Sequence, residues 1–241
     1  MRPSARRVLA VLVLLLSGAT AGRTQPDDAI PFCEEPARRH QTLDTRGLAA
    51  VYCTPGPGLS TSMEAAHASA RPLFYGAVPL AWGVAALRGG EGRAAAYRLT
   101  LSQGVTYGLV LGLKHAVGRP RPYVRRPLGS RSAHYGPSQG EQYQSFPSGH
   151  AALSAALATS WGHTHPRWYV IGPGATWAAG VALSRLYLGV HYPSDVIVGA
   201  ALGAGLATLI HQFRGALTPP RLRGDPRAVP RAPPVGLRIQ F

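Results

Sequence analysis

The residues of this sequence that are best suited to catalysis fall in three short clusters between positions 114 and 195. The first is Lys114-His115-Ala116-Val117-Gly118-Arg119-Pro120-Arg121-Pro122, the second is Pro147-Ser148-Gly149-His150, and the third contains Ser184, Arg185, His191 and Asp195. Lysine and arginine bind phosphate oxygens through charge-assisted hydrogen bonds, and two histidines can supply a nucleophile and a proton donor. The clusters therefore indicate cleavage of a phosphate ester.

Asp195 is the only acidic residue between Glu141 and Asp225. A carboxylate isolated in an apolar stretch is usually paired or hydrogen-bonded, because burying it unpaired is costly. Asp195 can hold one histidine in a single tautomer, as the third member of a catalytic triad does. The alternative is an exposed aspartate that caps a helix.

Five apolar segments must position these clusters. They are Leu73–Leu87, Ala94–Val117, Ser148–Gly162, Trp168–Arg185 and Ser194–Phe213. Each is too long for a typical strand and rich in Ala and Leu, so each is predicted to be a helix. If consecutive helices run antiparallel, the four helix ends that carry the clusters lie on the same side of one bundle.

Glycines have two expected roles in this arrangement. The third segment starts at Ser148, where free backbone N–H groups favour an anion, and Gly149 lets a ligand approach the backbone. Small residues also recur at every fourth position, which lets helix backbones pack closely. They are Gly104, Gly108 and Gly112 in the second segment, and Gly199 and Gly203 in the fifth.

The three clusters together resemble the type 2 phosphatidic acid phosphatase family. The shared pattern is Lys, six residues, Arg-Pro; then Pro-Ser-Gly-His; then Ser-Arg, five residues, His, three residues, Asp. That family shares its site with vanadium-dependent haloperoxidases and bacterial non-specific acid phosphatases. The motifs cover about a third of the chain, from Lys114 to Asp195.

The resemblance implies an all-α fold, a five- to six-helix bundle of the acid phosphatase/vanadium haloperoxidase type. It also implies that His191 attacks phosphorus, that Asp195 orients His191, and that His150 protonates the leaving oxygen. The implied phosphate-binding residues are Lys114, Arg121, Ser148, Gly149 and Arg185. No metal or other cofactor is expected in this chemistry. Arg119 occupies a non-motif position and is expected to be solvated.

The length of 241 residues fits one domain with a sizeable core. Residues 1–21 resemble a signal peptide, with early arginines, an apolar core over Val8–Leu16 and a small-residue cleavage site. An uncleaved anchor is the alternative. Residues 22–70 are predicted to form an irregular arm with one short helix near 59–70, residues 71–213 the helical phosphatase domain, and residues 214–241 a Pro/Arg-rich tail with a strand-like end.

Export would place both cysteines in an oxidising compartment. Cys33 and Cys53 follow the cleavage site, so they could form a disulfide. Closing a loop of about 20 residues would contribute roughly 3 kcal/mol by the chain-entropy estimate. Two free thiols are the alternative.

The sequence leaves both a membrane-embedded and a soluble exported bundle open. The last two segments are long enough to span a bilayer, whereas segments of about 15 residues reach only about 22 Å. The distribution of charge favours insertion, because the end opposite the motifs carries arginines that the positive-inside rule places in the cytoplasm. They are Arg88, Arg93, Arg98, Arg167 and Arg214. We therefore expect inner-membrane association, with the motif end on the periplasmic side; a soluble periplasmic protein is the alternative.

The net charge of +15 comes almost entirely from 24 scattered arginines. No stripe of basic residues alternates with aromatics, so nucleic acid is not an expected partner. A basic surface favours phosphates or acidic lipid head groups. The predicted function is an exported phosphatase for phosphorylated lipids, pyrophosphates or small phosphate esters. Its alternatives are a soluble periplasmic acid phosphatase, a vanadate-dependent haloperoxidase and a non-catalytic phosphate-binding membrane protein.

Overall fold

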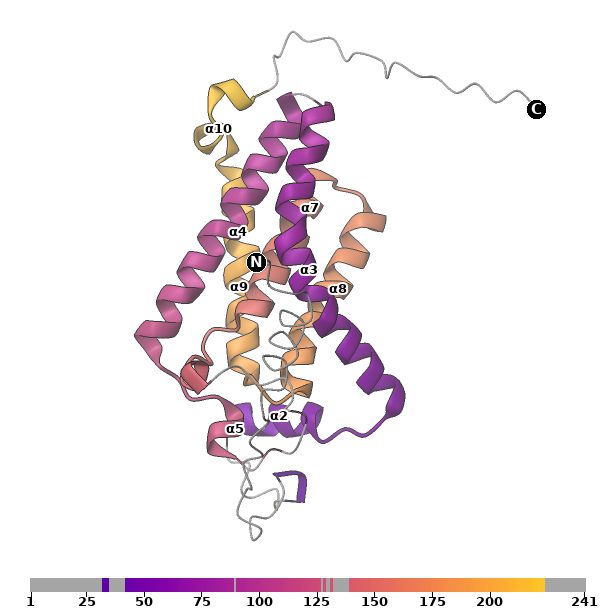
Figure 1. Ribbon diagram of the computed structural model, residues 1–241, viewed down its shortest axis with the longest axis vertical. Coiled ribbons are helices and arrows are strands. Elements are labelled where there is room, and N and C mark those ends of the chain that lie inside the picture. The colour runs from indigo at the N-terminus through magenta and orange to yellow at the C-terminus, as the bar shows by residue number, and fades with distance from the viewer. Residues whose placement is uncertain are drawn as a thin grey trace, which may run out of the picture. The chain divides into compact units, whose positions relative to one another are not determined.

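The computed structural model describes residues 32–34, 42–88, 90–126, 128, 131 and 139–223. Every regular element in these ranges is helical, which confirms the predicted all-α class. The long helices (Figure 1) are α3 (Pro57–Arg88), α4 (Gly90–Val117), α7 (Gly149–Thr164), α8 (Trp168–Tyr187) and α9 (Pro193–Gln212). They follow the order of the predicted apolar segments, and all but α3 begin close to the predicted residue.

Helix α3 departs most from the predicted boundaries. It joins the short helix predicted near 59–70 to the segment predicted from Leu73, begins at Pro57, and continues through Pro72 and Pro79. Proline suits the first position of a helix but removes a backbone donor from its interior, so these prolines and the polar residues before Leu73 obscure the helical pattern. Packing of α3 against α4 and α8 supports the whole helix despite them.

The arm predicted to be irregular over 22–70 contains a second helix, α2 (Leu43–Tyr52). Its start is fixed by a capping box, in which Thr42 and Thr45 exchange hydrogen bonds between side chain and backbone. Its buried residues are Thr45, Leu48 and Tyr52, which lie three or four positions apart and form one stripe. Because α2 packs against α8 and α9, the helical domain begins well before residue 71.

Helix α7 packs against α3, α4, α8 and α9. Its closest approach is to α9, where a Cβ on Gly199 would lie 2.5 Å from the carbonyl oxygen of Ser148 and one on Gly203 would lie 1.9 Å from that of Ala152. The predicted packing role of these glycines is therefore confirmed. Within the described residues the same prediction is wrong for α4, because none of their atoms outside the helix lies within 4 Å of a Cβ on its glycines. These outward-facing residues are Gly104, Gly108 and Gly112.

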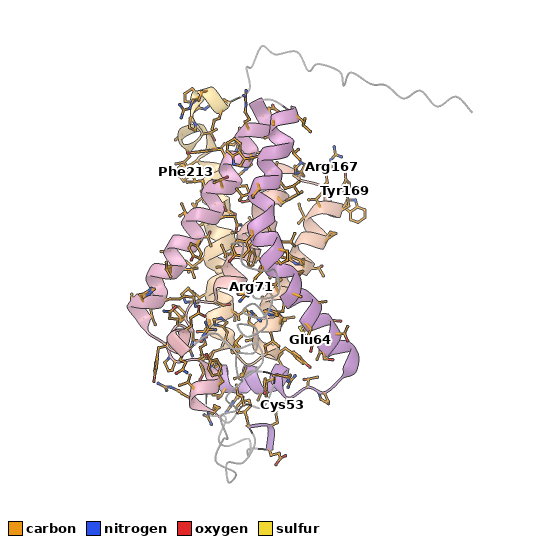
Figure 2. All side chains as sticks on the ribbon, viewed as in Figure 1. Cys53, Glu64, Arg71, Arg167, Tyr169 and Phe213 are labelled. Carbon is orange, nitrogen blue, oxygen red and sulfur yellow. A yellow bond between two sulfur atoms is a disulfide. The ribbon has the colours of Figure 1, made fainter. Side chains whose placement is uncertain are left out.

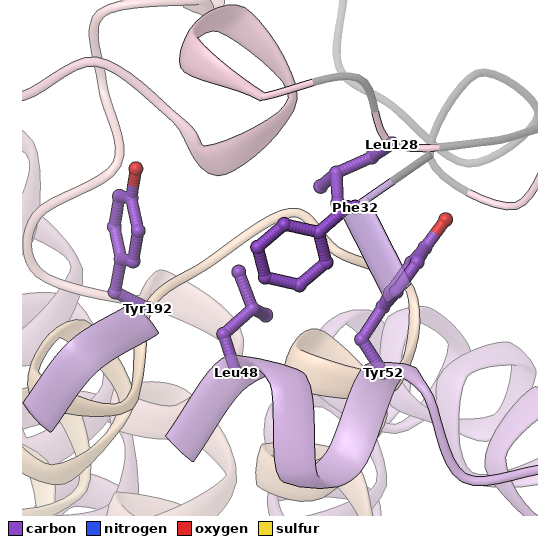
Figure 3. Packing of buried hydrophobic residues seen from close by; sticks show 5 residues of the cluster. All are labelled: Phe32, Leu48, Tyr52, Leu128 and Tyr192. Atoms are coloured by element: carbon purple, nitrogen blue, oxygen red, sulfur yellow. The ribbon is translucent and has the colours of Figure 1, made fainter. Parts of the chain in front are cut away.

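A disulfide joins Cys33, in the short helix η1 (Phe32–Glu34), to Cys53 at the end of α2, with a Cα–Cα distance of 5.5 Å. Beside it, side chains from separate segments point toward Phe32 (Figure 3). The buried members of this cluster are Phe32, Leu48, Tyr52, Leu128 and Tyr192. The disulfide and the cluster hold α2 next to Tyr192, which directly follows His191.

Four further short helices lie between and after the long helices in the described part of the chain. They are α5 (Pro122–Arg125), η3 (Gln139–Glu141), α10 (Arg214–Leu217) and η4 (Pro220–Leu222). In Figure 1, α2 and α5 lie at one end of the long helices and α10 lies at the other. The predicted signal peptide and the strand-like end of the tail lie outside the described residues.

Candidate active site

The four helix ends that carry the motifs meet at one end of the bundle. The backbone N–H of Ser148, at the start of α7, donates to the carbonyl oxygen of Asp195 in the first turn of α9 at 2.9 Å. An added Cβ on Gly149 would lie 3.9 Å from Cε of Lys114, in the last turn of α4. The loop between α8 and α9 brings His191 to the same place. Antiparallel packing therefore gathers residues that lie far apart in the sequence.

His191 and Asp195 are buried side by side. Their exposed fractions are 3% and 0%, and the His191 Nδ1 atom lies 3.7 Å from Oδ2 of Asp195. This separation is longer than a hydrogen bond but allows a strong charge interaction. The same Oδ2 accepts hydrogen bonds from the Ser145 hydroxyl at 2.5 Å and from the Tyr192 N–H at 2.8 Å. Asp195 is therefore a hydrogen-bonded buried carboxylate, as its isolation in the sequence predicts.

The sharp turn before His191 requires Gly189. Its φ is +68°, a region that favours glycine. A Cβ at this position would also lie 2.8 Å from Leu128 and 2.9 Å from the Tyr52 ring. Both the backbone angle and the lack of space therefore require glycine at position 189. The turn that it forms directs His191 into the bundle.

Arg121 fixes which nitrogen of His191 carries the lone pair. The Arg121 Nη1 atom lies 3.2 Å from Nε2 of His191, and the side chain also donates to the carbonyl oxygens of Glu141 and Val190. A guanidinium donates and does not accept, so Nε2 is the acceptor. The proton of the neutral imidazole is then on Nδ1, facing Asp195. In this tautomer the lone pair is on Nε2, and it can attack an electrophile once the Arg121 hydrogen bond moves from Nε2 to that group.

Burial lowers the pKa of His191 to about 3, and Arg121 adds to this effect while Asp195 opposes it. Between about pH 6.5 and pH 3 the unfolded chain thus binds a proton at this position that the folded chain does not. We expect the free energy of unfolding to fall as the pH falls through this window, by at most about 1.4 kcal/mol per pH unit for one proton. Chemical unfolding of the wild type and of His191→Gln at several pH values measures this contribution, and identical pH slopes would contradict a neutral buried His191.

The other predicted phosphate ligands surround this pair. Lys114 donates from Nζ to the carbonyl oxygen of Gln144, and Arg185 donates from Nη2 to Nδ1 of His67 at 2.9 Å. In the described part of the chain, Nε of Arg185 and Nε2 of His150 are buried without a hydrogen-bond partner. Unpaired buried polar groups are costly and call for an explanation such as a ligand. An anion between these side chains would satisfy them.

Three residues of this site escaped sequence reasoning. Arg119, expected to be solvated, instead donates from Nη1 to Oδ1 of Asp195 at 2.5 Å and from Nη2 to Asp44 at 2.7 Å. His67 on α3 contacts Arg185, and its ring centroid lies 5.9 Å from that of His150. The scarcity of acids could have drawn attention to Asp44, whereas no pattern in the sequence marks His67.

The motif residues of the site also lie within a match to a known protein family. A model of the PAP2 superfamily matches residues 95–219, which is more than half of the chain. The chain belongs to the PAP2 superfamily. The resemblance drawn from the motifs is therefore confirmed, and the matched range contains every predicted phosphate-site residue. Asp44 and His67 precede the PAP2 match.

Several named phosphatases resemble part of the chain. It is 37% identical over 99 residues to the lipid A 1-phosphatase of Rhizobium johnstonii, covering 40% of this chain and 38% of that protein. It is 44% identical over 73 residues to the decaprenylphosphoryl-5-phosphoribose phosphatase of Mycobacterium tuberculosis, covering 30% and 38%. It is 42% identical over 82 residues to the phosphatidylglycerophosphatase B of Escherichia coli, covering 31% and 32%. The aligned region thus spans less than two fifths of these relatives' own lengths.

Two solved structures share the PAP2 fold of this chain. The crystal structure of Aquifex aeolicus LpxE superposes with a TM-score of 0.57 at 22% identity, covering 71% of this chain and 96% of that one. The crystal structure of a transmembrane PAP2-type phosphatidylglycerolphosphate phosphatase from Bacillus subtilis gives a TM-score of 0.51 at 24% identity, covering 76% and 92%. At these identities the likeness concerns the fold.

Proposed function

We propose that this PAP2 protein hydrolyses phosphate monoesters or pyrophosphates of lipids through a phosphohistidine formed on His191. One observation carries the proposal: a buried imidazole whose Nε2 accepts from Arg121 and whose Nδ1 faces Asp195. This is the state of a histidine prepared to attack phosphorus. The cationic side chains around it match the charge of a phosphoryl group.

The two histidines divide the reaction between them. In the first step, Nε2 of His191 forms a bond to phosphorus while the bond from phosphorus to the leaving oxygen breaks, and His150 gives a proton to that oxygen. Burial and Arg185 lower the pKa of His150, so it takes up this proton only when the negative charge of the bound phosphate offsets them. In the second step, neutral His150 takes a proton from water, whose oxygen bonds to phosphorus as the P–N bond breaks. Inorganic phosphate leaves and His191 regains its lone pair. Asp195 stabilises the positive charge on the ring of His191 in the phosphohistidine.

The cations supply the electrostatic part of catalysis. Phosphoryl transfer spreads negative charge over three equatorial oxygens, and positioned donors stabilise that charge. Arg121 and Arg185 are 6% and 4% exposed, so their charges act in a medium poor in water. Together with Lys114 and the N–H groups at the start of α7, they form the phosphate cradle of the proposed enzyme.

A lipid environment is supported by the outer surface of the helices. Many large apolar side chains are exposed on α3, α4, α8 and α9. They include Leu73, Leu80, Leu87, Val105, Leu109, Leu111, Ile171, Leu183, Ile197 and Leu209. An exposed apolar surface this extensive favours a membrane partner. In the described residues, α9 is the one helix long and apolar enough to cross a bilayer, a criterion that some buried core helices also meet.

The charge distribution supports an orientation for the bundle. Tyr169 and Phe213 are exposed at the end opposite the site, where Arg167 also lies (Figure 2), and Trp168, the first residue of α8, is exposed beside Tyr169. Aromatic residues favour membrane interfaces, and arginines favour the cytoplasmic side. Arg125 and Arg126 at the active end run against this rule, but they line the cavity beside the site, where they can serve phosphate binding. The proposed orientation, with the active end toward the periplasm, agrees with the predicted export signal. The names of the relatives add support, since each acts on a lipid-linked phosphate.

One experiment tests both the chemistry and the membrane setting. Membranes from cells expressing the chain are washed with alkaline carbonate and assayed for phosphate released from phosphatidic acid, phosphatidylglycerol phosphate, isoprenyl pyrophosphate, lipid A and p-nitrophenyl phosphate. We expect the activity to remain in the washed membranes and to favour lipid substrates. Membranes lacking the chain give the background. Activity in the wash with a preference for the soluble ester would favour a soluble acid phosphatase, and no hydrolysis of any ester would contradict the proposed function.

A further inference from the structure

Helix α2 reaches the active site through Asp44. The Oδ2 atom of Asp44 accepts from Nη2 of Arg119 at 2.7 Å, and Nη1 of the same guanidinium donates to Oδ1 of Asp195 at 2.5 Å. One arginine thus bridges two carboxylates, of which the inner one faces His191. Charge-assisted contacts of this kind are short and directional.

Ser194 closes the network around this bridge. Its backbone N–H donates to Oδ1 of Asp44 at 2.9 Å, and its hydroxyl donates to Oδ2 at 2.7 Å. The Ser194 hydroxyl also accepts from Nη1 of Arg119 at 2.7 Å. Since Ser194 lies in the first turn of α9, Asp44 satisfies a backbone donor that has no partner within that helix. The start of α9 is therefore tied to α2 by a side chain that lies outside the motifs.

These contacts determine how the carboxylate of Asp195 is oriented. Arg119 occupies Oδ1, so the other oxygen is the one that faces Nδ1 of His191. The Ser145 hydroxyl and the Tyr192 N–H hold Oδ2. Loss of Arg119 would therefore leave Oδ1 without this partner and let the carboxylate shift, which would weaken its alignment with His191. We propose that Asp44 and Arg119 are positioning residues, which hold Asp195 in the orientation that prepares the nucleophile. This inference rests on the proposed function.

The position of α2 is itself well defined. A Cβ on Gly47 would lie 2.8 Å from Cγ of Pro193, so α2 packs directly on the first residue of α9. The disulfide from Cys53 to Cys33 fixes the far end of α2, and the cluster around Phe32 covers its buried stripe. Asp44 is thus presented by a clamped helix rather than by a loose arm.

Asp44 and Arg119 can be altered without removing core. Their side chains are 23% and 27% exposed, and both line an open cavity of about 300 Å³ beside Arg125, Arg126 and Tyr192. The ion pair of Asp44 with Arg119 is partly open to water, which weakens its contribution to stability. Removing Arg119 costs more, because it leaves the buried Asp195 without this cation. Asparagine at position 44 keeps an oxygen for the Ser194 N–H while removing the charge that faces Arg119. The Asp44→Asn variant therefore tests positioning more than folding.

The experiment is a double-mutant cycle with Asp44→Asn, Arg119→Met and the double variant, assayed for kcat and KM on the best lipid substrate. We expect Asp44→Asn to lower kcat roughly 10- to 100-fold, the cost of a catalytic group displaced by about 1 Å, with KM within about threefold of the wild type. We expect the double variant to be no slower than Arg119→Met, because Asp44 acts through Arg119. Glu64→Gln, at an exposed carboxylate of α3, is the matched control and should keep wild-type kcat.

Three outcomes would overturn the inference. They are a wild-type kcat in Asp44→Asn, effects of the two variants that simply multiply, and a loss of activity equal to the loss of folded protein by thermal unfolding. If Asp44→Asn fails to fold, Arg119→Lys decides: it keeps the charge but loses the bridge, so an unchanged kcat would reject the positioning role. Inactive wild-type protein in this assay would count against the proposed function, whereas an active wild type with an equally active Asp44→Asn would count against this inference alone.

Discussion

Replacing His191 with alanine is expected to lower phosphate release by roughly 10⁴-fold or more, the usual consequence of removing a catalytic nucleophile. The variant should still bind phosphate, because the cradle of Lys114, Arg121 and Arg185 remains. The His191→Ala variant should fold but should not form the acid-labile phosphoenzyme. Steady-state phosphate release and trapping of radiolabelled protein after an acid-free quench measure the two effects.

His115→Ala is the matched control for this variant. His115 follows Lys114 directly, but its side chain is exposed, and its Nδ1 atom lies 2.8 Å from the carbonyl oxygen of Leu111 in the preceding turn. Its replacement should leave activity near that of the wild type. Phosphate release by His191→Ala within tenfold of the wild type, roughly, would reject His191 as the nucleophile.

Gly203→Ala is expected to have the largest effect on stability. The added methyl group would lie 1.9 Å from the carbonyl oxygen of Ala152, and since that atom belongs to the backbone of α7, the two helices must separate. Overpacking of this kind costs about 1–3 kcal/mol, occasionally more. For a domain of this size the midpoint of thermal unfolding should fall by about 2–10 °C, which a thermal unfolding scan of the purified protein measures.

Gly205→Ala tests the same chemical change in the same helix. No atom outside α9 lies within 4 Å of a Cβ at this position, and alanine is the better helix former by up to about 1 kcal/mol. We therefore expect an unchanged or slightly higher unfolding midpoint. Equal losses in both variants would show that glycine matters for the helix itself rather than for the contact between α7 and α9.

The part of the site that the sequence predicts is the part that its motifs encode. Lys114, Arg121, His150 and His191 lie at helix ends, and antiparallel packing is sufficient to bring such ends together. The apolar segments likewise predict the five long helices, since each needs a buried face. Both inferences depend on patterns that are local in the sequence.

The residues that the sequence does not reveal depend on contacts between distant segments. An aspartate such as Asp44 is common in the first turn of any helix, so its contact with Arg119 has no local signature. For the glycines of α4 the sequence predicts a helix contact that the structure does not show. Their regular spacing indicates a smooth helix face but does not indicate which element packs against it. Pro72 likewise obscured that the short helix predicted near 59–70, which contains His67, continues into the next segment. Tertiary packing decides each of these cases.

The hydrogen bonds of Lys114 and Arg185 have a consequence for the resting protein. In the described part of the chain, both donate to neutral partners, a carbonyl oxygen and an imidazole nitrogen, and neither forms an ion pair with a carboxylate. With Arg121 nearby, folding brings like charges together, and Glu141 and Asp195 offset only part of their repulsion. An anion that enters the site relieves this repulsion. The repulsion therefore lowers the stability of the protein without a ligand and raises its affinity for phosphate. In the proposed reaction the same attraction also holds the phosphate product tightly. Release of phosphate is then the step that can limit turnover.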